Sequence, residues 1–182
     1  MTQTTSGDEN SGLAESTILI VDDNIQNVEL LQAYLESLPC RILTAYDGVE
    51  AMALIEASPT RPDLVLLDIM MPKMSGFEVC KKIKEDLATR SILVLIVTAL
   101  NELGDIERGV DAGTDDFLTK PVNKLELITR VKSLLRVRHL KRELDRAMEI
   151  SRDLESRLGE GEGEDDGEGE GDDAGAEDGP VG

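Results

Sequence analysis

Five polar residues that could carry metal or phosphoryl chemistry stand at the ends of short apolar segments of this chain. These residues are Asp22, Asp23, Asp68, Thr98 and Lys120. Carboxylate oxygens without histidine or cysteine select a hard cation, and Mg²⁺ suits such a set best. Mg²⁺ together with an ammonium and a hydroxyl group can stabilise a phosphoryl group during transfer. The residue types therefore indicate a magnesium-dependent phosphoryl site, provided that the fold brings them together.

The segments before these residues read as strands that alternate with helices. Strands are expected at 17–21, 41–45, 63–67, 92–98 and 116–118, and helices begin near residues 24, 47, 77, 103 and 123. Strands that are apolar throughout predict a parallel sheet covered by helices on both faces. The chain is thus expected to be α/β, a doubly wound five-stranded parallel sheet with five helices, the last of them extended. Segment 92–98 is the most apolar and is expected to be the central strand.

Ligands in such sheets bind at the carboxyl ends of the strands, where all five polar residues would meet. Two carboxylates about 4 Å apart repel by roughly 4 kcal/mol at an effective dielectric near 20. A proton or a cation must relieve this repulsion. The alternative is that Asp22 and Asp23 cap the first helix while Lys120 pairs with Asp68. That alternative accounts for each residue alone but not for their shared position.

Composition limits the class of protein. The chain has 182 residues, 40% of them hydrophobic and only 2% aromatic, which is enough for one aliphatic core. No apolar stretch is long enough to cross a membrane, and the polar N-terminus does not resemble a signal peptide. Cys40 and Cys80 lack metal-ligand spacing and are expected to be reduced thiols in a cytoplasmic protein.

Charge divides the chain into regions. Residues 159–182 hold eleven of the 38 acidic residues and no Lys or Arg, so we expect a disordered acidic tail. This tail is either an interaction segment or a spacer without a partner. Residues 1–15 read as a flexible leader, 16–136 as the folded domain and 137–158 as a helical extension. The net charge of −19 argues against direct binding of nucleic acid.

The extension carries an apolar seam with coiled-coil spacing. The seam positions are Val137, Leu140, Leu144, Ala147, Ser151, Leu154 and Leu158. A parallel homodimer is compatible with this seam but weakly specified, because Arg136 would face Lys141 and Glu143 would face Met148. The alternative is a solvated extension of the last helix.

Basic residues cluster at the start of the same extension: Arg136, Arg138, Lys141, Arg142 and Arg146. We expect them to form a solvated helix face rather than a DNA contact. His139, the one histidine of the chain, is expected to be an ordinary surface residue. A phosphotransfer histidine would need a helical bundle around it.

Four motifs resemble the receiver domain of two-component response regulators, and the resemblance covers about residues 17–136. The motifs are VDD at 21–23, LLDIMMPKMSG at 66–76, VTA at 97–99 and DDFLTKP at 115–121. The linker after them is similar to that of receivers which precede diguanylate cyclase domains. A cyclase is not expected here, because GEGEGEDDGEGEG lacks the phenylalanine and the strand residues of the cyclase signature.

The resemblance implies a flavodoxin-like fold and a role for each site residue. Asp68 would be the phosphoacceptor, and Mg²⁺ would be held by Asp22, Asp23, Asp68 and the backbone carbonyl of Met70. Lys120 and the hydroxyl of Thr98 would contact the phosphoryl oxygens, helped by the N–H of Ala99. Thr98 and Phe117 would form the switch, and a cis bond would join Lys120 to Pro121.

The resemblance also implies a function in phosphorelay signal transduction. The protein would be a single-domain response regulator, not an enzyme, that takes a phosphoryl group from a sensor histidine kinase or phosphotransfer protein. Phosphorylation would switch the surface of the fourth helix, fifth strand and fifth helix for binding a downstream protein or for homodimerisation. Met70 and Leu100 occupy positions that tune phosphoryl loss, and neither can orient a water, so self-dephosphorylation should be slow.

Two other functions compete with this one. A haloacid-dehalogenase-like hydrolase also uses an aspartyl nucleophile, but on its first strand and with a second Asp two residues later, where this chain has Met70. A dimerisation module with a vestigial site would not need all five site residues.

Overall fold

The computed structural model describes residues 12–57, 61–99 and 103–159, apart from the side chains of 103–106, 158 and 159. The ordered elements follow the expected alternation of strand and helix along the chain. They are β1 (Thr17–Val21), α2 (Ile25–Leu35), β2 (Arg41–Ala45), α3 (Gly48–Ala57), β3 (Leu64–Leu67), α4 (Gly76–Glu85), β4 (Leu93–Thr98), α5 (Leu103–Asp111), β5 (Asp116–Thr119) and α6 (Lys124–Gly159). The expected leader and acidic tail fall largely outside the described residues.

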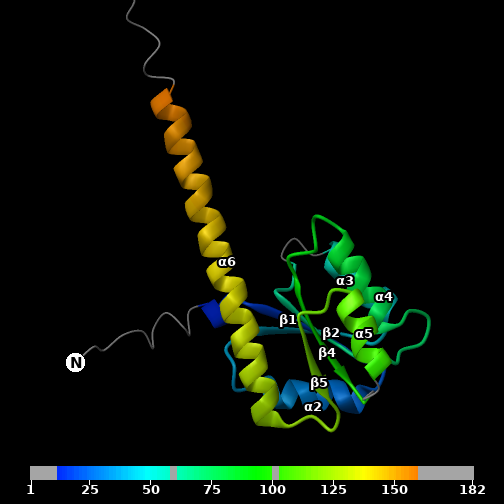
Figure 1. Ribbon diagram of the computed structural model, residues 1–182. Coiled ribbons are helices and arrows are strands. Elements are labelled where there is room, and N and C mark those ends of the chain that lie inside the picture. The colour runs from blue at the N-terminus through cyan, green and yellow to red at the C-terminus, as the bar shows by residue number, and fades with distance from the viewer. Residues whose placement is uncertain (1–11, 58–60, 100–102, 160–182) are drawn as a thin grey trace, which may run out of the picture. The chain divides into compact units, whose positions relative to one another are not determined.

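The five strands form one parallel sheet in the order β2-β1-β3-β4-β5. The doubly wound flavodoxin-like prediction is therefore confirmed (Figure 1). The central strand is β3, so the expectation that 92–98 would be central was wrong. β4 lies one strand from the edge, and its apolar character follows from helices on both of its faces rather than from a central position.

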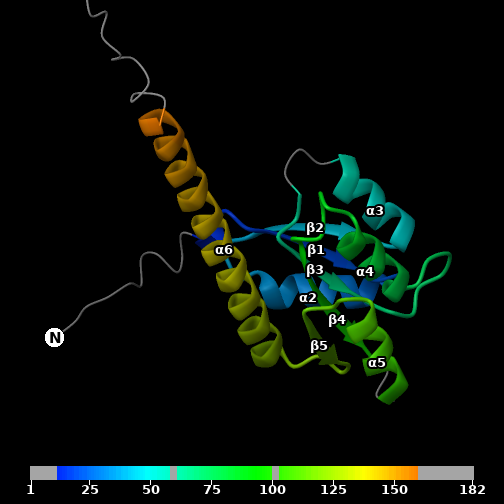
Figure 2. The same cartoon turned by 45° about the horizontal axis from the view of Figure 1, so that its top comes forward.

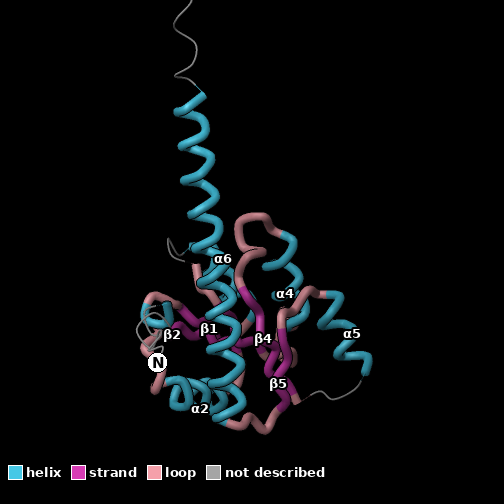
Figure 3. Tube along the Cα trace, turned by 60° about the vertical axis from the view of Figure 1, so that its left-hand side comes forward, coloured by secondary structure: helices cyan, strands magenta, loops and turns pink. Residues whose placement is uncertain are grey.

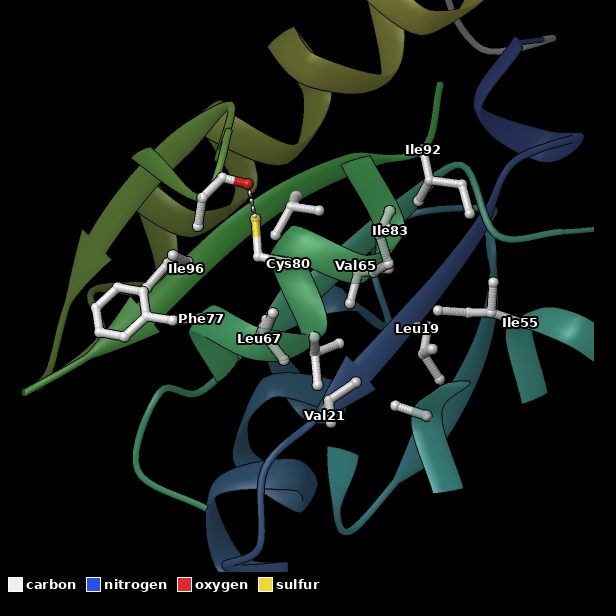
Figure 4. Close-up of a cluster of buried hydrophobic side chains, with 14 of the residues drawn as sticks. Leu19, Val21, Ile55, Val65, Leu67, Phe77, Cys80, Ile83, Ile92 and Ile96 are labelled. Atoms are coloured by element: carbon white, nitrogen blue, oxygen red, sulfur yellow. Dashed lines mark hydrogen bonds between the residues drawn. The ribbon is translucent and has the colours of Figure 1, made fainter. Parts of the chain in front are cut away.

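Helices cover both faces of the sheet and enclose two apolar layers (Figure 2). Side chains of α3 and α4 pack on one face, where Cys80 donates its thiol hydrogen to the carbonyl of Ala112 (Figure 4). Side chains of α2 and of the first turns of α6 pack on the other face. Both cysteines are free. The alternating helix placement leaves the carboxyl edge of the sheet open for a site.

α2 and α4 begin at the capping residues that their sequences supply. The side chain of Asn24 accepts a hydrogen bond from the N–H of Gln26, as expected for a helix cap. Ser75 and Glu78 form a reciprocal capping box at the start of α4. These two caps start the helices directly after the loops that follow β1 and β3, and so hold the site loops in place.

A cluster of ion pairs at the amino edge of the sheet connects α6 to the residue before β3. The buried carboxylate of Asp63 lies 2.7 Å from Nη2 of Arg142 and 3.6 Å from Nε of Arg138. Its second oxygen accepts the N–H of Thr17 at 3.0 Å. The prediction of a solvated basic face was therefore wrong for Arg138 and Arg142, because the buried Asp63 charge draws them to the sheet.

α6 continues as one helix beyond this cluster (Figure 3). The chain divides into two compact units, one ending at Glu143 and the other starting at Leu144. His139 is partly buried and lies 3.3 Å from the carboxylate of Glu143, one helical turn away. Among the described residues, no helix combines the length and apolar character that a membrane crossing requires.

Candidate functional site

The carboxyl ends of β1 and β3 bring Asp22, Asp23 and Asp68 together. Val21 and Leu67 are paired in register, and the N–H of Asp68 donates to the carbonyl of Val21 at 2.9 Å. The three aspartates directly follow these two strand ends. One carboxylate oxygen from each lies within 4.8 Å of the others. The predicted convergence of the acidic residues is thus present in the fold.

The donor set of this cluster fits Mg²⁺. It consists of carboxylate oxygens, and the described residues place no histidine or cysteine in it. Asp22 and Asp68 are buried, at 2% and 6% exposure, whereas Asp23 is exposed to solvent. Mg²⁺ prefers a few carboxylates and keeps several of its waters, which this half-open arrangement allows. A cation there would offset the repulsion of the aspartates.

Lys120 joins two of these carboxylates from the end of β5. Its Nζ lies 2.7 Å from Oδ2 of Asp22 and 3.2 Å from Oδ1 of Asp68. Burial lowers the pKa of Lys120, but the hydrogen bond and charge of Asp22 and the charge of Asp68 outweigh it and raise that pKa above its ordinary value. The ammonium group therefore stays charged. The Lys120–Pro121 peptide bond is cis, as the resemblance implied.

The contacts of Lys120 bear on the alternative that Asp22 and Asp23 only cap the first helix while Lys120 pairs with Asp68. Lys120 does pair with Asp68, but its shorter contact is with Asp22. Asp22 also accepts the backbone N–H of Asn24 at 2.9 Å and the side-chain amide of Asn27 at 3.1 Å. Helix capping in α2 is performed by Asn24 rather than by the aspartates. Capping of α2 therefore does not explain the position of the aspartates.

The surroundings of Asp68 disfavour the charged form of its carboxyl group. Burial raises the pKa of Asp68, the charge of Lys120 lowers it in part, and the charge of Asp22 raises it further, leaving a net increase. The anion of Asp68 is thus held in an environment that favours an added cation. That property suits a carboxylate whose reactivity depends on a bound metal.

Thr98 is the last residue of β4, the strand next to β3, and Phe117 lies on β5, the strand on the other side of β4. Thr98 is 4% exposed and pairs in register with Thr119, while Phe117 pairs with Ile96. The Phe117 ring is partly buried and rests against Gly109 of α5. A β-carbon at Gly109 would come within 2.3 Å of that ring. The two residues proposed for the switch therefore stand on neighbouring strands, with α5 closing over the ring.

The loop positions after the strands lie where the sequence placed them. Met70 follows β3 by three residues, and its side chain is 66% exposed. Ala99 directly follows β4 and is exposed. Leu100, the second position expected to tune phosphoryl loss, lies outside the described residues.

Two glycines make close contacts that the sequence analysis did not predict, although it placed Gly76 in a turn. A β-carbon on Gly76 would lie 2.2 Å from the carbonyl oxygen of Asp68, so only glycine allows α4 to start this close to the loop. Gly109 makes room for the ring of Phe117. A glycine inside a helix lowers stability by about 1 kcal/mol relative to alanine. A glycine at position 109 of an expected helix therefore could have indicated that a neighbouring side chain needs the space.

Comparison with known proteins agrees with this geometry. Residues 18–132 match the response regulator receiver domain. The response regulator PleD of Caulobacter vibrioides is 48% identical over 119 residues, which are 65% of this chain and 26% of PleD. A receiver domain of a signal transduction histidine kinase from Syntrophus aciditrophicus is 35% identical, with a TM-score of 0.63 over 67% of this chain and 91% of that one.

A second similar structure is that of a phosphorylated protein. The cyanobacterial phytochrome response regulator RcpA is 33% identical and has a TM-score of 0.59, covering 66% of this chain and 91% of that one. The chain spans about a quarter of PleD and about half of the other curated relatives it matches. The matched family region covers β1 through the first part of α6 and contains every residue of the acidic cluster. This chain belongs to the family of response regulator receiver domains.

Proposed function

We propose that Asp68 is the phosphoacceptor of a response regulator that works as a phosphorylation-controlled adaptor. Receiver domains of two-component systems are phosphorylated on aspartate with Mg²⁺. The observation that supports Asp68 is its position, buried at the end of the central strand and in contact with Lys120. Asp23 is exposed, and Asp22 already accepts hydrogen bonds on both oxygens.

Transfer would proceed by attack of a carboxylate oxygen of Asp68 on the phosphorus of a phosphohistidine. The new O–P bond forms an acyl phosphate, and the N–P bond breaks to leave the histidine of the kinase or phosphotransfer protein. Asp22, Asp23, Asp68 and the carbonyl of Met70 would hold Mg²⁺, which supplies positive charge to the phosphoryl oxygens. Lys120 would move part of its pairing from the carboxylates to those oxygens.

Phosphorylation would then act on Thr98 and Phe117. A phosphoryl group adds up to about two negative charges and strong acceptor oxygens. The hydroxyl of Thr98 would turn toward them, and the ring of Phe117 would move into the space left behind. Because that ring touches Gly109, its movement would change the surface made by α5, β5 and α6. The change is a shift between two packings of the same elements.

The output of this switch would be a binding event rather than a reaction. Receiver domains interact with histidine kinases and with downstream targets. We propose that the switched surface binds a downstream protein or a second copy of the chain, and that α6 beyond residue 137 contributes to self-association. Direct contact with nucleic acid is disfavoured by the net charge of −19.

Incubation with acetyl phosphate and Mg²⁺, followed by intact mass measurement, tests Asp68. A gain of one phosphoryl group is expected in the wild type and not in Asp68→Asn. Asp145→Asn, which removes an exposed carboxylate on α6, serves as the matched control and should be labelled like the wild type. Turnover of a phosphoester without a stable adduct would indicate a hydrolase. Labelling that persists in Asp68→Asn would show that another residue is the phosphoacceptor.

A further inference from the structure

The carboxyl-terminal part of α6 presents a large apolar surface to solvent. Leu144, Met148, Ile150 and Leu154 are each between 49% and 62% exposed. Contiguous exposed apolar surface of this kind marks an interaction site in most soluble proteins. Leu144 and Leu154 belong to the seam, and Met148 and Ile150 lie directly beside it on its two sides. A second helix packed on the seam could therefore cover all four.

The first two seam residues, which belong to the unit that ends at Glu143, are not covered by that unit. Arg138 and Arg142 point to Asp63, whereas Val137 and Leu140 are 58% and 56% exposed. Successive residues of a helix are about 100° apart, so the seam lies on the face of α6 opposite these arginines. The contacts of the two arginines with Asp63 therefore leave Val137 and Leu140 facing solvent.

A parallel pairing of two such helices would be unfavourable. In a parallel coiled coil, the position before every second seam residue, here 136, 143 and 150, faces the partner position that lies five residues later. Arg136 would then face Lys141 with like charge. Ile150 would face the charged Glu155, and Ser151 would face itself in the core. The parallel arrangement leaves both charge and apolar surface unmatched.

We propose that the seam binds a second copy of this chain in the antiparallel direction, centred near residue 149. Reversal of one helix brings each flanking position against the same kind of position of the second copy. Lys141 then faces Glu155 of the second copy, and Glu143 faces its Arg157. Each contact occurs twice by symmetry, which gives four attractive pairs. Within their own helix, Glu143 and Arg157 make exposed pairs that leave them able to shift.

The apolar residues match in the same register. Leu144 packs against Leu154 of the second copy at both ends of the interface. Ala147 packs against Ser151 near the middle, where small side chains let the helices approach closely. Met148 and Ile150 each meet their own equivalents across the two-fold axis and cover that middle section on both sides. Every exposed apolar residue from Leu144 to Leu154 gains an apolar neighbour.

This inference rests on the self-association included in the proposed function, but not on phosphoryl transfer. Sedimentation equilibrium of the full unphosphorylated chain tests it. Lys141→Glu and Glu155→Lys should each raise the dimer dissociation constant roughly tenfold, because two attractive pairs become repulsive. The double variant should return it to within about threefold of the wild type. Glu149→Lys makes the same charge change on the outer face of α6 and should leave the constant within about twofold.

Lys141→Glu separates the two directions by the sign of its effect. In a parallel dimer it would remove repulsion from Arg136 and tighten association, which would overturn the proposal. A monomeric wild type at the highest soluble concentration would overturn it as well. Labelling of the same variants with acetyl phosphate reports separately on the Asp68 site, so loss of dimerisation and loss of phosphorylation are distinguishable.

Disulfide formation gives a second, geometric measurement in a Cys40→Ala background. Met148→Cys should form a disulfide-linked dimer on mild oxidation, because residue 148 faces its own equivalent only in the antiparallel register. Leu144→Cys alone should not, and its crosslinking at the rate of the 148 variant would indicate a parallel pair. Cys80 does not interfere, since it is fully buried and burial raises its pKa to about 11.

Discussion

At the scale of single residues, the site depends on how each side chain is surrounded rather than on its type alone. Asp22 and Asp68 are both buried aspartates within reach of Lys120. Asp22 is fully engaged by Asn24 and Asn27, whereas burial leaves Asp68 with a raised pKa. The two neighbouring carboxylates therefore differ in their surroundings, and this difference is why we propose Asp68 rather than Asp22 as the phosphoacceptor.

Met70→Asn is expected to shorten the lifetime of the phosphorylated form several-fold. The exposed methionine cannot orient a water molecule for attack on the acyl phosphate, whereas an amide at this position can. The decay of phosphorylated mass after removal of the phosphodonor measures this lifetime. Met70→Leu, which is also unable to orient water, should decay like the wild type. Equal decay of the asparagine variant would show that residue 70 does not control the rate.

At the scale of elements, α5 is positioned by contacts that the phosphoryl site can reach. Gly109 allows the Phe117 ring to lie against this helix, and Arg108 stacks over the ring of Phe77, 4.6 Å from its centre. The first contact joins α5 to β5, and the second joins α5 to α4. A movement of the Phe117 ring would therefore change the contact between α5 and β5.

Gly109→Ala should destabilise the fold by about 1–3 kcal/mol, because the added methyl group overlaps the Phe117 ring. Urea unfolding gives the free energy of unfolding. Phe117→Leu should remove most of the cost of the glycine substitution, so the two changes should be strongly non-additive. Val110→Ala is the matched control on the exposed side of the same helix and should change stability by less than about 0.5 kcal/mol. Additive effects of Gly109→Ala and Phe117→Leu would mean that the two residues do not interact.

The elements were predictable from sequence to a far greater degree than the contacts between them. Apolar runs and the cap residue Asn24 located the strands and α2 to within a residue or two. The pairing of Asp63 with Arg138 and Arg142 was not predictable, because no local pattern links residues so far apart in the chain. The aspartate cluster was predictable for the opposite reason: parallel topology alone brings the strand ends together.

At the scale of the whole molecule, the acidic cluster couples metal binding to folding. The unfolded chain cannot hold its aspartates close together, so Mg²⁺ should bind the folded state preferentially. The tail adds acidic residues outside the matched family region and makes nonspecific binding of cations a necessary control. Net charge alone cannot supply the geometry that a specific site requires.

Mg²⁺ should therefore raise the free energy of unfolding, by about 2.7 kcal/mol at a hundred times its dissociation constant. Urea unfolding with Mg²⁺ and with EDTA measures this difference. Asp23→Asn should lose most of the gain, because it removes the exposed ligand without disturbing a buried contact. Asp145→Asn should retain the gain in full. A gain that survives in Asp23→Asn would assign the effect to general screening of negative charge.

The central strand β3 has a consequence for transplanting parts of this protein. Asp63 directly precedes this strand, and Asp68 directly follows it. Asp63 binds α6 through ion pairs with Arg138 and Arg142. A helix grafted from this chain onto another receiver would lack its anchor unless that receiver also had an acidic residue before its third strand. Chimeras that join this extension to foreign receivers should be designed with Asp63 and the two arginines as one inseparable set.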